Sequence, residues 1–358
     1  MGHAWIDGRS VELQAACAEA ARLLGASRLP VIAGLGTDIG GARAAIFLAR
    51  RLDAAVDHMH ADVLLHDLDV VRDAGMMVTT PTEARVRADV LLLAGPLAAD
   101  AWPGLATGTA DGRDRQIVWL CPGRARRGAR GAKVQIIGRD ADDLPAIIAA
   151  LRAAVARRPV GALPVAAKAL AAAATQLQSA RFGVAIWSAA ALDALTIEML
   201  CGLVKDLNAT TRFSGLPVPP GDNALGVLQA CGWMTGFPPR TGFGRGIAEH
   251  DPWRFDAHRL VESGEADCVL WISAYRPAAP PWTRDLPTIA LTGDGAGFHR
   301  RPRVHVAVGR PGIDHDATEH VAAAGTLAWV AAAAPRDTIS VADVLAGIAA
   351  ALPGTPPC

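Results

Sequence analysis

Three short apolar runs occur twice along the chain, in the same order each time. The paired segments are residues 28–33 with 181–186, 88–93 with 266–271, and 133–138 with 303–309. Each run is continuously apolar rather than alternating, which is typical of strands buried on both faces of a parallel sheet. Such a recurrence indicates a duplicated unit, and parallel strands require crossover helices. We therefore predict an α/β protein with two related, doubly wound αβα domains whose sheets are mostly parallel.

Segments between the predicted strands supply the crossover helices. Helical spacing of apolar residues predicts a first helix at residues 10–25, with Ser10 as its N-cap. Further helices are expected at residues 42–52, 143–156 and 190–207. Taken alone, the repeat also fits two tandem halves, 1–160 and 161–358.

The composition is that of a globular protein with no bias toward a charged partner. Of 358 residues, 51% are hydrophobic, and 35 acidic residues balance 35 basic ones. This balance gives no indication of binding to nucleic acid or to an anionic membrane. No apolar run reaches the ~18 residues of a membrane span, and the N-terminus lacks the pattern of a secretory signal. The six cysteines form no C-x-x-C pair, so we expect reduced thiols in a cytoplasmic protein.

The segment 221–246 is the least regular part of the chain. It holds seven of the 36 glycines, together with the adjacent Pro238 and Pro239. Glycine and proline interrupt helices and strands, so we expect a short helix at 223–231 followed by a long loop. Glycine allows close approach to a ligand, and long ordered loops are often functional. The alternative is a simple crossover between two halves of the fold.

A glycine-rich turn follows the first predicted strand. It reads Gly34-x-Gly36-x-x-Ile39, where isoleucine replaces the third glycine of the dinucleotide-binding pattern G-x-G-x-x-G. Asp53 lies at about the chain distance expected for a ribose-binding acid. Asp38, however, is placed to cap the following helix, where it would repel a phosphate. We therefore expect a turn that binds no dinucleotide.

The densest group of potential metal ligands lies at residues 57–69 and includes His58, His60 and His66. A His-x-His motif at a strand end is how several metal hydrolases begin their site. The candidates for completing such a site are Asp314, His315, Asp316 and His320. They form no convincing set, so a polar loop at a domain boundary is the preferred interpretation. A metal-dependent hydrolase using His58 and His60 is the alternative.

Five cations lie within ten glycine-rich residues, namely Arg124, Arg126, Arg127, Arg130 and Lys133. Such a run is usually a solvated surface loop. The functional alternative is an anion-docking patch, for which the four arginines are the candidate residues.

Two motifs in the glycine-rich segment carry a family resemblance. Asn223-x-x-Gly226-x-x-Gln229 and Gly232-Trp233-x-Thr235-Gly236-Phe237-Pro238 resemble the corresponding run in the B subunit of formylmethanofuran dehydrogenase. That family belongs to the molybdopterin oxidoreductases related to formate dehydrogenase, in which this run lies beside the pterin. The resemblance covers residues 5–333 and includes the B subunits of methylotroph formyltransferase/hydrolase complexes. It implies a vestigial cofactor cleft with five candidate residues: Asn223, Gly226, Trp233, Thr235 and Gly236.

The resemblance also implies a domain arrangement and a lost site. In the family, the chain leaves the first domain, builds the second and returns, which here gives 1–58 plus 221–358, and 59–220. The family's metal ligand is a cysteine followed by a catalytic histidine, and the corresponding positions are Val63 and Leu64. Neither side chain ligates a metal or transfers a proton. The family's cysteine-rich iron–sulfur domain is also missing, so we expect no pterin, molybdenum, tungsten or cluster on this chain and no catalytic residue.

The function implied by the resemblance is that of a non-catalytic structural subunit. The complex converts formyl-tetrahydromethanopterin to formate through formyl-methylofuran in one-carbon metabolism. The expected partners are the amidohydrolase-like A subunit, the C subunit and the D subunit, which is the formyltransferase. Methylofuran is the expected carrier, and the arginine loop is a candidate for holding its polyanionic tail. Three alternatives stay open: an active tungsten or molybdenum subunit, the histidine-based hydrolase, and a nucleotide-binding α/β protein.

Overall fold

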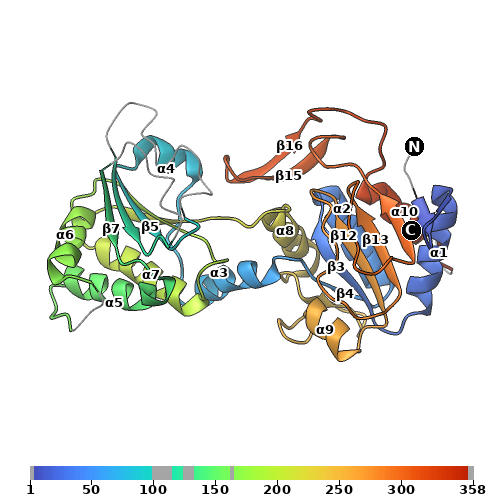
Figure 1. Ribbon diagram of the computed structural model, residues 1–358, viewed down its shortest axis with the longest axis horizontal. Coiled ribbons are helices and arrows are strands. Elements are labelled where there is room, and N and C mark those ends of the chain that lie inside the picture. The colour runs from blue at the N-terminus through green and yellow to red at the C-terminus, as the bar shows by residue number, and fades with distance from the viewer. Residues whose placement is uncertain (1–3, 99–114, 124–132, 162–164, 354–358) are drawn as a thin grey trace. The chain divides into compact units, whose positions relative to one another are not determined.

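The computed structural model describes residues 4–98, 115–123, 133–161 and 165–353. The chain divides into two compact units, each shown in Figure 1 as a sheet with flanking helices. The first unit comprises Met1–Ala61, Gly221–Val321 and Thr326–Cys358, and the second comprises Asp62–Pro220 with Ala322–Gly325. The chain therefore passes from the first unit into the second and then returns.

The first unit is built on a nine-stranded sheet in the order β11-β10-β4-β3-β12-β13-β14-β1-β2. Its parallel centre consists of β4 (Ala55–Val56), β3 (Pro30–Gly36), β12 (Cys268–Ser273), β13 (Thr288–Thr292) and β14 (Val304–Ala307). Antiparallel strands border this centre: β1 (Ala4–Ile6) and β2 (Arg9–Val11) on one side, β10 (Thr241–Gly242) and β11 (Glu249–His250) on the other. A separate ribbon pairs β15 (Ala317–Val321) with β16 (Thr326–Val330).

Helices cover both faces of this sheet. One core contains buried residues of α1 (Leu13–Ala26), α2 (Ile39–Arg51), α8 (Ala224–Thr235) and α10 (Val341–Ala351). The opposite core contains residues of α9 (Ala257–Ser263). Successive strand residues alternate between the two cores, so that Ile32 joins the first while Val31 and Ala33 join the second. This two-sided burial explains why β3 reads as a continuous apolar run.

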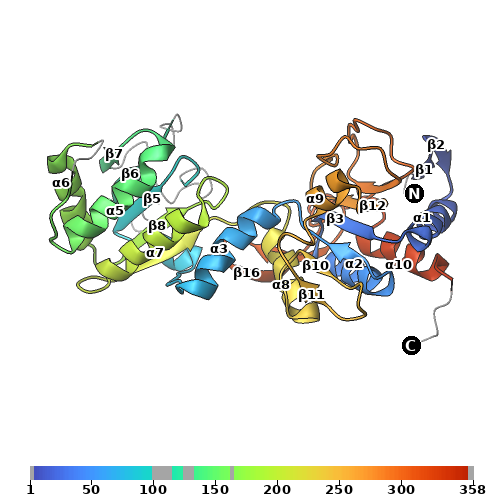
Figure 2. The same ribbon diagram turned by 90° about the horizontal axis from the view of Figure 1, so that it is seen from below.

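The second unit has a fully parallel five-stranded sheet in the order β7-β6-β5-β8-β9. These strands are Lys133–Ile137, Gln116–Leu120, Val90–Ala94, Gly183–Trp187 and Phe213–Pro217. Its helices are α3 (Ala61–Asp73), α4 (Pro81–Arg87), α5 (Leu144–Val155), α6 (Ala167–Gln178) and α7 (Ala194–Leu207), with a short 3₁₀ turn η1 at Ala141–Asp143. Figure 2 shows α5 and α7 lying along one face of this sheet. The predicted α/β class with mostly parallel sheets is confirmed.

The segments that recur in the sequence form equivalent strands of the two sheets. The central order β4-β3-β12-β13-β14 of the first unit corresponds to β9-β8-β5-β6-β7 of the second. The three sequence pairs are then β3 with β8, β12 with β5, and β14 with β7. Each pair takes one strand from each unit, although the two units do not correspond to the two halves of the chain.

The starts of two helices differ from the sequence expectation. Ser10 does not cap α1, which begins at Leu13, because Ser10 is paired within β2. The helix expected from residue 190 begins at Ala194 as α7, where Asp193 caps its first turn. None of the described helices combines the length and apolar character that crossing a membrane requires.

The helix expected at residues 223–231 is longer than predicted. As α8 it continues to Thr235 and ends at Gly236, which has a φ of 82°. Gly232 is accommodated inside the helix, whereas Gly236 adopts the left-handed conformation that commonly ends one. The loop that follows contains β10 and β11 and is therefore partly paired into the sheet.

Candidate functional site at the strand-order switch

The order of strands in the first unit reverses between β3 and β12. From β3 the sheet continues outward to β4, whereas from β12 it continues in the other direction to β13 and β14. In open α/β sheets, ligands bind at such a point, outside the carboxyl ends of the strands. The candidate site therefore comprises the segments after β3, β4 and β12 and the turn that precedes α8.

Asp222 lies at the centre of a polar cluster at this point. Its side chain is 5% exposed, and its Oδ2 lies 2.9 Å from Nε2 of His60 and 2.7 Å from a guanidinium nitrogen of Arg276. Burial acts to raise the pKa of Asp222, but the hydrogen bond from His60 and the charge of Arg276 hold it below its usual value. The carboxylate is therefore ionised, and it is hydrogen-bonded to His60 and paired with the cation of Arg276.

Asn223 connects three separate segments of the first unit. Its side-chain amide donates to the Thr37 carbonyl at 2.9 Å, and its Oδ1 accepts the backbone amide of His320 at 2.9 Å. Gly226 lies one helical turn after Asn223. A Cβ at Gly226 would overlap the Asn223 side chain, so only glycine fits at that position. Asn223 and Asp222 have φ angles of 56° and 55°, a conformation that non-glycine residues rarely adopt. Functional sites often hold such strained residues.

The other three residues predicted to line a vestigial cleft lie at the far end of α8. The 12 residues of this helix span about 18 Å. Trp233 is 65% exposed near its C-terminus, the hydroxyl of Thr235 donates to the Cys231 carbonyl at 2.7 Å, and Gly236 ends the helix. The structure thus places Asn223 and Gly226 at the switch point and separates Trp233, Thr235 and Gly236 from them.

Both nitrogens of His58 are engaged within the cluster. Its Nδ1 accepts the backbone amide of His60 at 3.0 Å, and its Nε2 lies 3.3 Å from the Asp222 carbonyl. Burial lowers the pKa of His58 to about 3, so the ring is neutral at pH 7. His66 lies elsewhere, with Nδ1 3.4 Å from the Ala189 carbonyl in the second unit.

The side chains considered as further metal ligands are not gathered around His58 and His60. Asp314 accepts the Arg310 backbone amide at 2.8 Å and pairs with Arg336 at 3.3 Å. Nδ1 of His315 lies 2.8 Å from the Asp316 carbonyl. Across the described ranges, no three His, Cys, Asp or Glu side chains are close enough together to hold a metal ion.

The glycine turn after β3 is shaped by close packing. Gly34 has a φ of 81°, and a Cβ there would overlap the Ile272 carbonyl of the neighbouring strand. Asp38 caps α2 by accepting the Gly41 amide at 2.9 Å, as the sequence predicts. Asp53 precedes β4, which runs parallel to β3. Asp53 therefore lies at the amino ends of the strands, whereas the turn lies at their carboxyl ends. In that position Asp53 cannot contact a ribose bound at the turn.

A cleft of about 190 Å³ opens at the carboxyl ends of β12, β13 and β14. Arg276 connects it to the Asp222 cluster, and Arg310, Arg336 and Asp294 line its polar walls. Tyr275 also lines it, and its hydroxyl donates to Glu319 at 2.5 Å. Burial and the neighbouring carboxylate raise the pKa of Tyr275. Small-molecule sites usually enclose about 300–1,000 Å³, so this cleft suits only a small group.

The positions expected to correspond to the redox site carry no donor atoms. Leu64 of α3 is buried, and Val63 packs against the core of the second unit. The described cysteines lie elsewhere in the chain, and burial raises the pKa of each thiol: Cys17, Cys121, Cys201, Cys231 and Cys268. The anion-docking candidates Arg124, Arg126, Arg127 and Arg130 lie outside the described residues.

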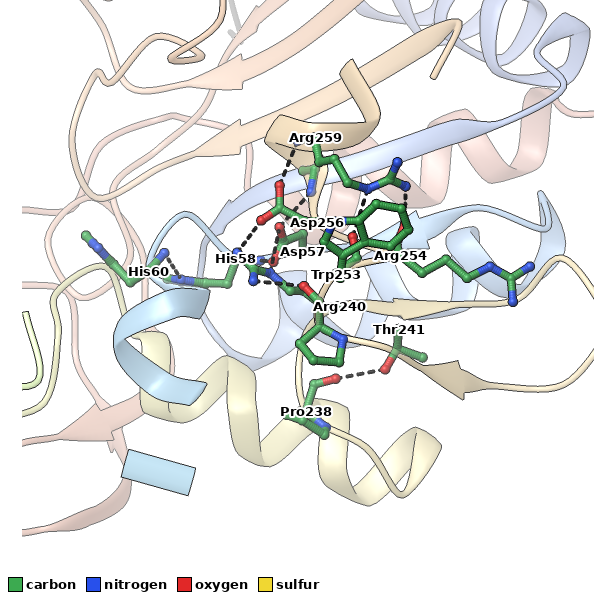
Figure 3. A network of polar contacts seen from close by, with 12 residues as sticks. Asp57, His58, His60, Pro238, Arg240, Thr241, Trp253, Arg254, Asp256 and Arg259 are labelled. Carbon is green, nitrogen blue, oxygen red and sulfur yellow. Dashed lines mark hydrogen bonds and ion pairs between the residues drawn. The ribbon is translucent and has the colours of Figure 1, made fainter. Parts of the chain in front are cut away.

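Sequence reasoning missed a second polar network, which holds the loop after α8 (Figure 3). The guanidinium of Arg240 lies 2.5 Å from Asp256 and 3.6 Å from Asp57, and it donates to the Pro252 carbonyl at 2.9 Å. Burial raises the pKa of Asp57 to about 7, against the charge of Arg240. The sequence signal for this network was Arg240 itself, an arginine among small and apolar residues. Its ion-pair partners could not be found from the sequence, because they are distant along the chain.

Comparison with known proteins confirms the predicted resemblance, although no family model matches the chain. The chain is 34% identical over 354 residues to the B subunit of the formyltransferase/hydrolase complex Fhc of Methylorubrum extorquens, covering 96% of this chain and 95% of the relative. A crystal structure of the M. extorquens complex FhcABCD with methylofuran matches with a TM-score of 0.82 at 34% identity, covering 96% of this chain and 97% of the matched one. The B subunit of tungsten-containing formylmethanofuran dehydrogenase 2 of Methanocaldococcus jannaschii is 28% identical over 286 residues, which are 75% of this chain and 65% of the relative.

The paired sheets, each with a strand-order switch, define an α/β protein of the formate dehydrogenase-like class. Within that class, the chain belongs to the family of formyltransferase/hydrolase complex B subunits.

Proposed function

We propose that this chain is a non-catalytic structural subunit of a formyltransferase/hydrolase complex. The observation that carries the proposal is the match over 96% of the chain to an Fhc B subunit. The assembled complex would convert formyl-tetrahydromethanopterin to formate through formyl-methylofuran. The partners would be the amidohydrolase-like A subunit, the C subunit and the D subunit, which is the formyltransferase.

The side chains at positions 63 and 64 support the loss of redox chemistry. A tungsten or molybdenum site in this family needs a thiolate ligand and a neighbouring proton-transfer group, and Val63 and Leu64 supply neither. The described cysteines are Cys17, Cys121, Cys201, Cys231 and Cys268, so none stands at or beside these two positions. The residues present do not fit the metal, so we assign no pterin, metal or cluster to this chain.

The polar cluster at the switch point also suits a structural role. Asp222 is hydrogen-bonded to His60 and paired with Arg276, and both nitrogens of His58 are engaged. A general base needs an accessible lone pair near the proton that it takes, and His58 has none to offer. The cluster joins the segments after β4 and β12 to the turn before α8. The hydrolase alternative is therefore less well supported by this geometry.

Assembly and metal content test this function together. The chain should be co-expressed with the A, C and D subunits of the same organism, with the purification tag on the formyltransferase. We expect this chain in the purified complex, with formyl transfer and hydrolysis intact and with tungsten and molybdenum far below one per complex by mass spectrometry. A stoichiometric amount of either metal would show an active redox subunit instead.

Two further measurements address the alternatives. The isolated chain should show no hydrolase activity, and His58→Ala should therefore leave the background rate unchanged. Replacing Arg124, Arg126, Arg127 and Arg130 with serine tests the proposed carrier contact at low salt. Unchanged methylofuran binding by the assembled complex would remove the arginine loop from the proposal.

A further inference from the structure

The chain crosses between the two units at three places, and a short segment of the first unit lies next to each crossing. We call these segments the first, second and third passages, and they comprise residues 58–61, 221–223 and 318–321. All three take part in the polar contacts around Asp222. We call the residues that make these contacts the hinge cluster: His58, His60, Asp222, Asn223, Arg276 and His320. Every member belongs to the first unit.

Asp222 joins the first passage to the second. Its Oδ2 lies 2.9 Å from Nε2 of His60, and its backbone carbonyl lies 3.3 Å from Nε2 of His58. Arg276, which follows β12, connects the same carboxylate to the sheet through a guanidinium nitrogen at 2.7 Å. The Asp222 side chain is only 5% exposed, so water competes little for these contacts. The first two passages are therefore held together at a buried charge.

Asn223 joins the second passage to the third. Its Oδ1 accepts the backbone amide of His320 at 2.9 Å, and its side-chain amide donates to the Thr37 carbonyl after β3. The third passage has a second attachment, because the hydroxyl of Tyr275 donates to Glu319. Tyr275 lies just after β12. All three passages are thus attached, directly or through one another, to the carboxyl ends of β3 and β12.

The backbone of the second passage is strained. Asp222 and Asn223 follow each other with φ angles of 55° and 56°, in the left-handed region that non-glycine residues rarely occupy. Such a conformation persists only where the surrounding contacts determine it. Hinges are short segments in which a few residues absorb large changes in φ and ψ. The second passage therefore has the properties of a hinge that its side-chain contacts hold in one conformation.

We propose that the hinge cluster couples the three passages, so that they loosen together, and that it thereby limits movement of the second unit relative to the first. Such movement requires every crossing of the chain to flex, because a single rigid crossing would prevent it. Contacts that join the crossings to one buried carboxylate make their loosening a single event. The role is conformational and does not depend on the proposed function, since it uses only contacts within the first unit.

Hydrogen exchange of the full chain, followed by mass spectrometry, tests the coupling. Asp222→Asn removes the charge that pairs with Arg276, and asparagine tolerates the left-handed backbone. We expect exchange to rise by about tenfold or more in all three passages. The third passage is decisive for this variant, because its link to the second runs through Asn223. Asn223→Gly should likewise raise exchange in the first passage, whose link runs through Asp222.

The matched control is Asp267→Asn, which removes a carboxylate that accepts backbone amides at the amino ends of β12 and β3. It should change exchange in the passages by less than about twofold, because it lies at the opposite edge of the sheet. Thermal unfolding checks that each variant keeps its fold. Arg276→Gln removes the same ion pair from its exposed side and replaces Asp222→Asn if that variant does not fold. Small-angle X-ray scattering should show a wider range of interatomic distances for the Asp222 variant than for the wild type.

Two results would overturn the proposal. If each substitution raises exchange only in the passages that lose a contact directly, the passages are held independently and the coupling is wrong. If exchange rises in all three passages while the scattering stays that of the wild type, the cluster does not limit movement of the units. Neither measurement involves the other subunits, so a failure here leaves the proposed function untouched.

Discussion

The carboxylate of Asp267 accepts the backbone amide of Arg28 at 3.0 Å, where β12 and β3 begin side by side. Asp89 accepts the amide of Arg181 at 2.9 Å in the same way, where β5 and β8 begin. Each acid also accepts the next amide along, that of Leu29 at 3.1 Å or Phe182 at 3.0 Å. The Ala-Asp dipeptides that recur in the sequence thus make the same contact in both units.

Removing either acid should destabilise its own unit. Asp89→Ala leaves the amides of Arg181 and Phe182 without their acceptor, which should cost about 1–3 kcal/mol of unfolding free energy. Urea denaturation gives this value, and hydrogen exchange should show the loss in β5 and β8. Asp69→Ala on α3, where the lost side chain is 46% exposed and pairs with Arg72 at 3.3 Å, is the control and should cost less than about 1 kcal/mol. Equal effects of the two substitutions would contradict the role given to Asp89.

Asn223 should be sensitive to both its side chain and its backbone conformation. Asn223→Ala removes two hydrogen bonds and places alanine at positive φ, for an expected loss of about 2–4 kcal/mol. Asn223→Gly removes the same hydrogen bonds without the backbone strain, so it should be about 1 kcal/mol more stable than the alanine variant. Denaturant unfolding of both variants checks this order. Equal stabilities would show that backbone strain at this position is negligible.

Arg240 should be far less replaceable than its exposed neighbours. Arg240→Met leaves the buried Asp57 and its neighbour Asp256 without their shared cation, and it should cost about 3–5 kcal/mol at pH 8, above the pKa of Asp57. Arg254→Met, in which the lost side chain is 51% exposed and pairs with Glu249, should cost no more than about 1 kcal/mol. Thermal unfolding under identical conditions compares the two. A stable Arg240→Met variant would show that Asp57 is already protonated in the folded chain.

His58 should make the fold sensitive to acid. Its pKa is about 3 in the folded chain, below the ordinary value of 6.5, because burial disfavours the charged ring. The unfolded chain therefore takes up this proton first, and stability falls as the pH decreases from about 6.5 toward 3. His58→Gln should lose less stability than the wild type between pH 6.5 and 4 in urea titrations. An unchanged acid dependence would contradict a neutral, buried His58.

Asp57 has the opposite effect on the pH dependence of stability, so the His58→Gln variant must be compared with the wild type at each pH. Burial raises its pKa to about 7, so the folded chain binds this proton more readily than the unfolded chain. Its contribution to stability therefore falls as the pH rises from about 4 to 7. The effect of His58 is obtained only from the difference between variant and wild type at each pH, because Asp57 is common to both.

The sequence by itself determined the kind of sheet and most of its strands. The runs predicted at 88–93, 133–138 and 181–186 overlap β5, β7 and β8. Strands buried on both faces must be apolar at every position, so local sequence is sufficient to find them. The aliphatic residues at 63 and 64 are likewise plain from the sequence, since their chemistry does not depend on where they lie.

Only the tertiary structure decided which residues meet. Asp222 lies beside His60 and Arg276, and Arg240 lies beside Asp57 and Asp256, because the sheet gathers distant strand ends at one edge. No local pattern records such a juxtaposition. The exposure of Trp233 could not be predicted from the sequence either. Helix α8 is apolar around most of its circumference, so packing against α2 determines which side of the helix is buried. Contacts between distant residues depend on the strand order, and the strand order is a property of the folded chain.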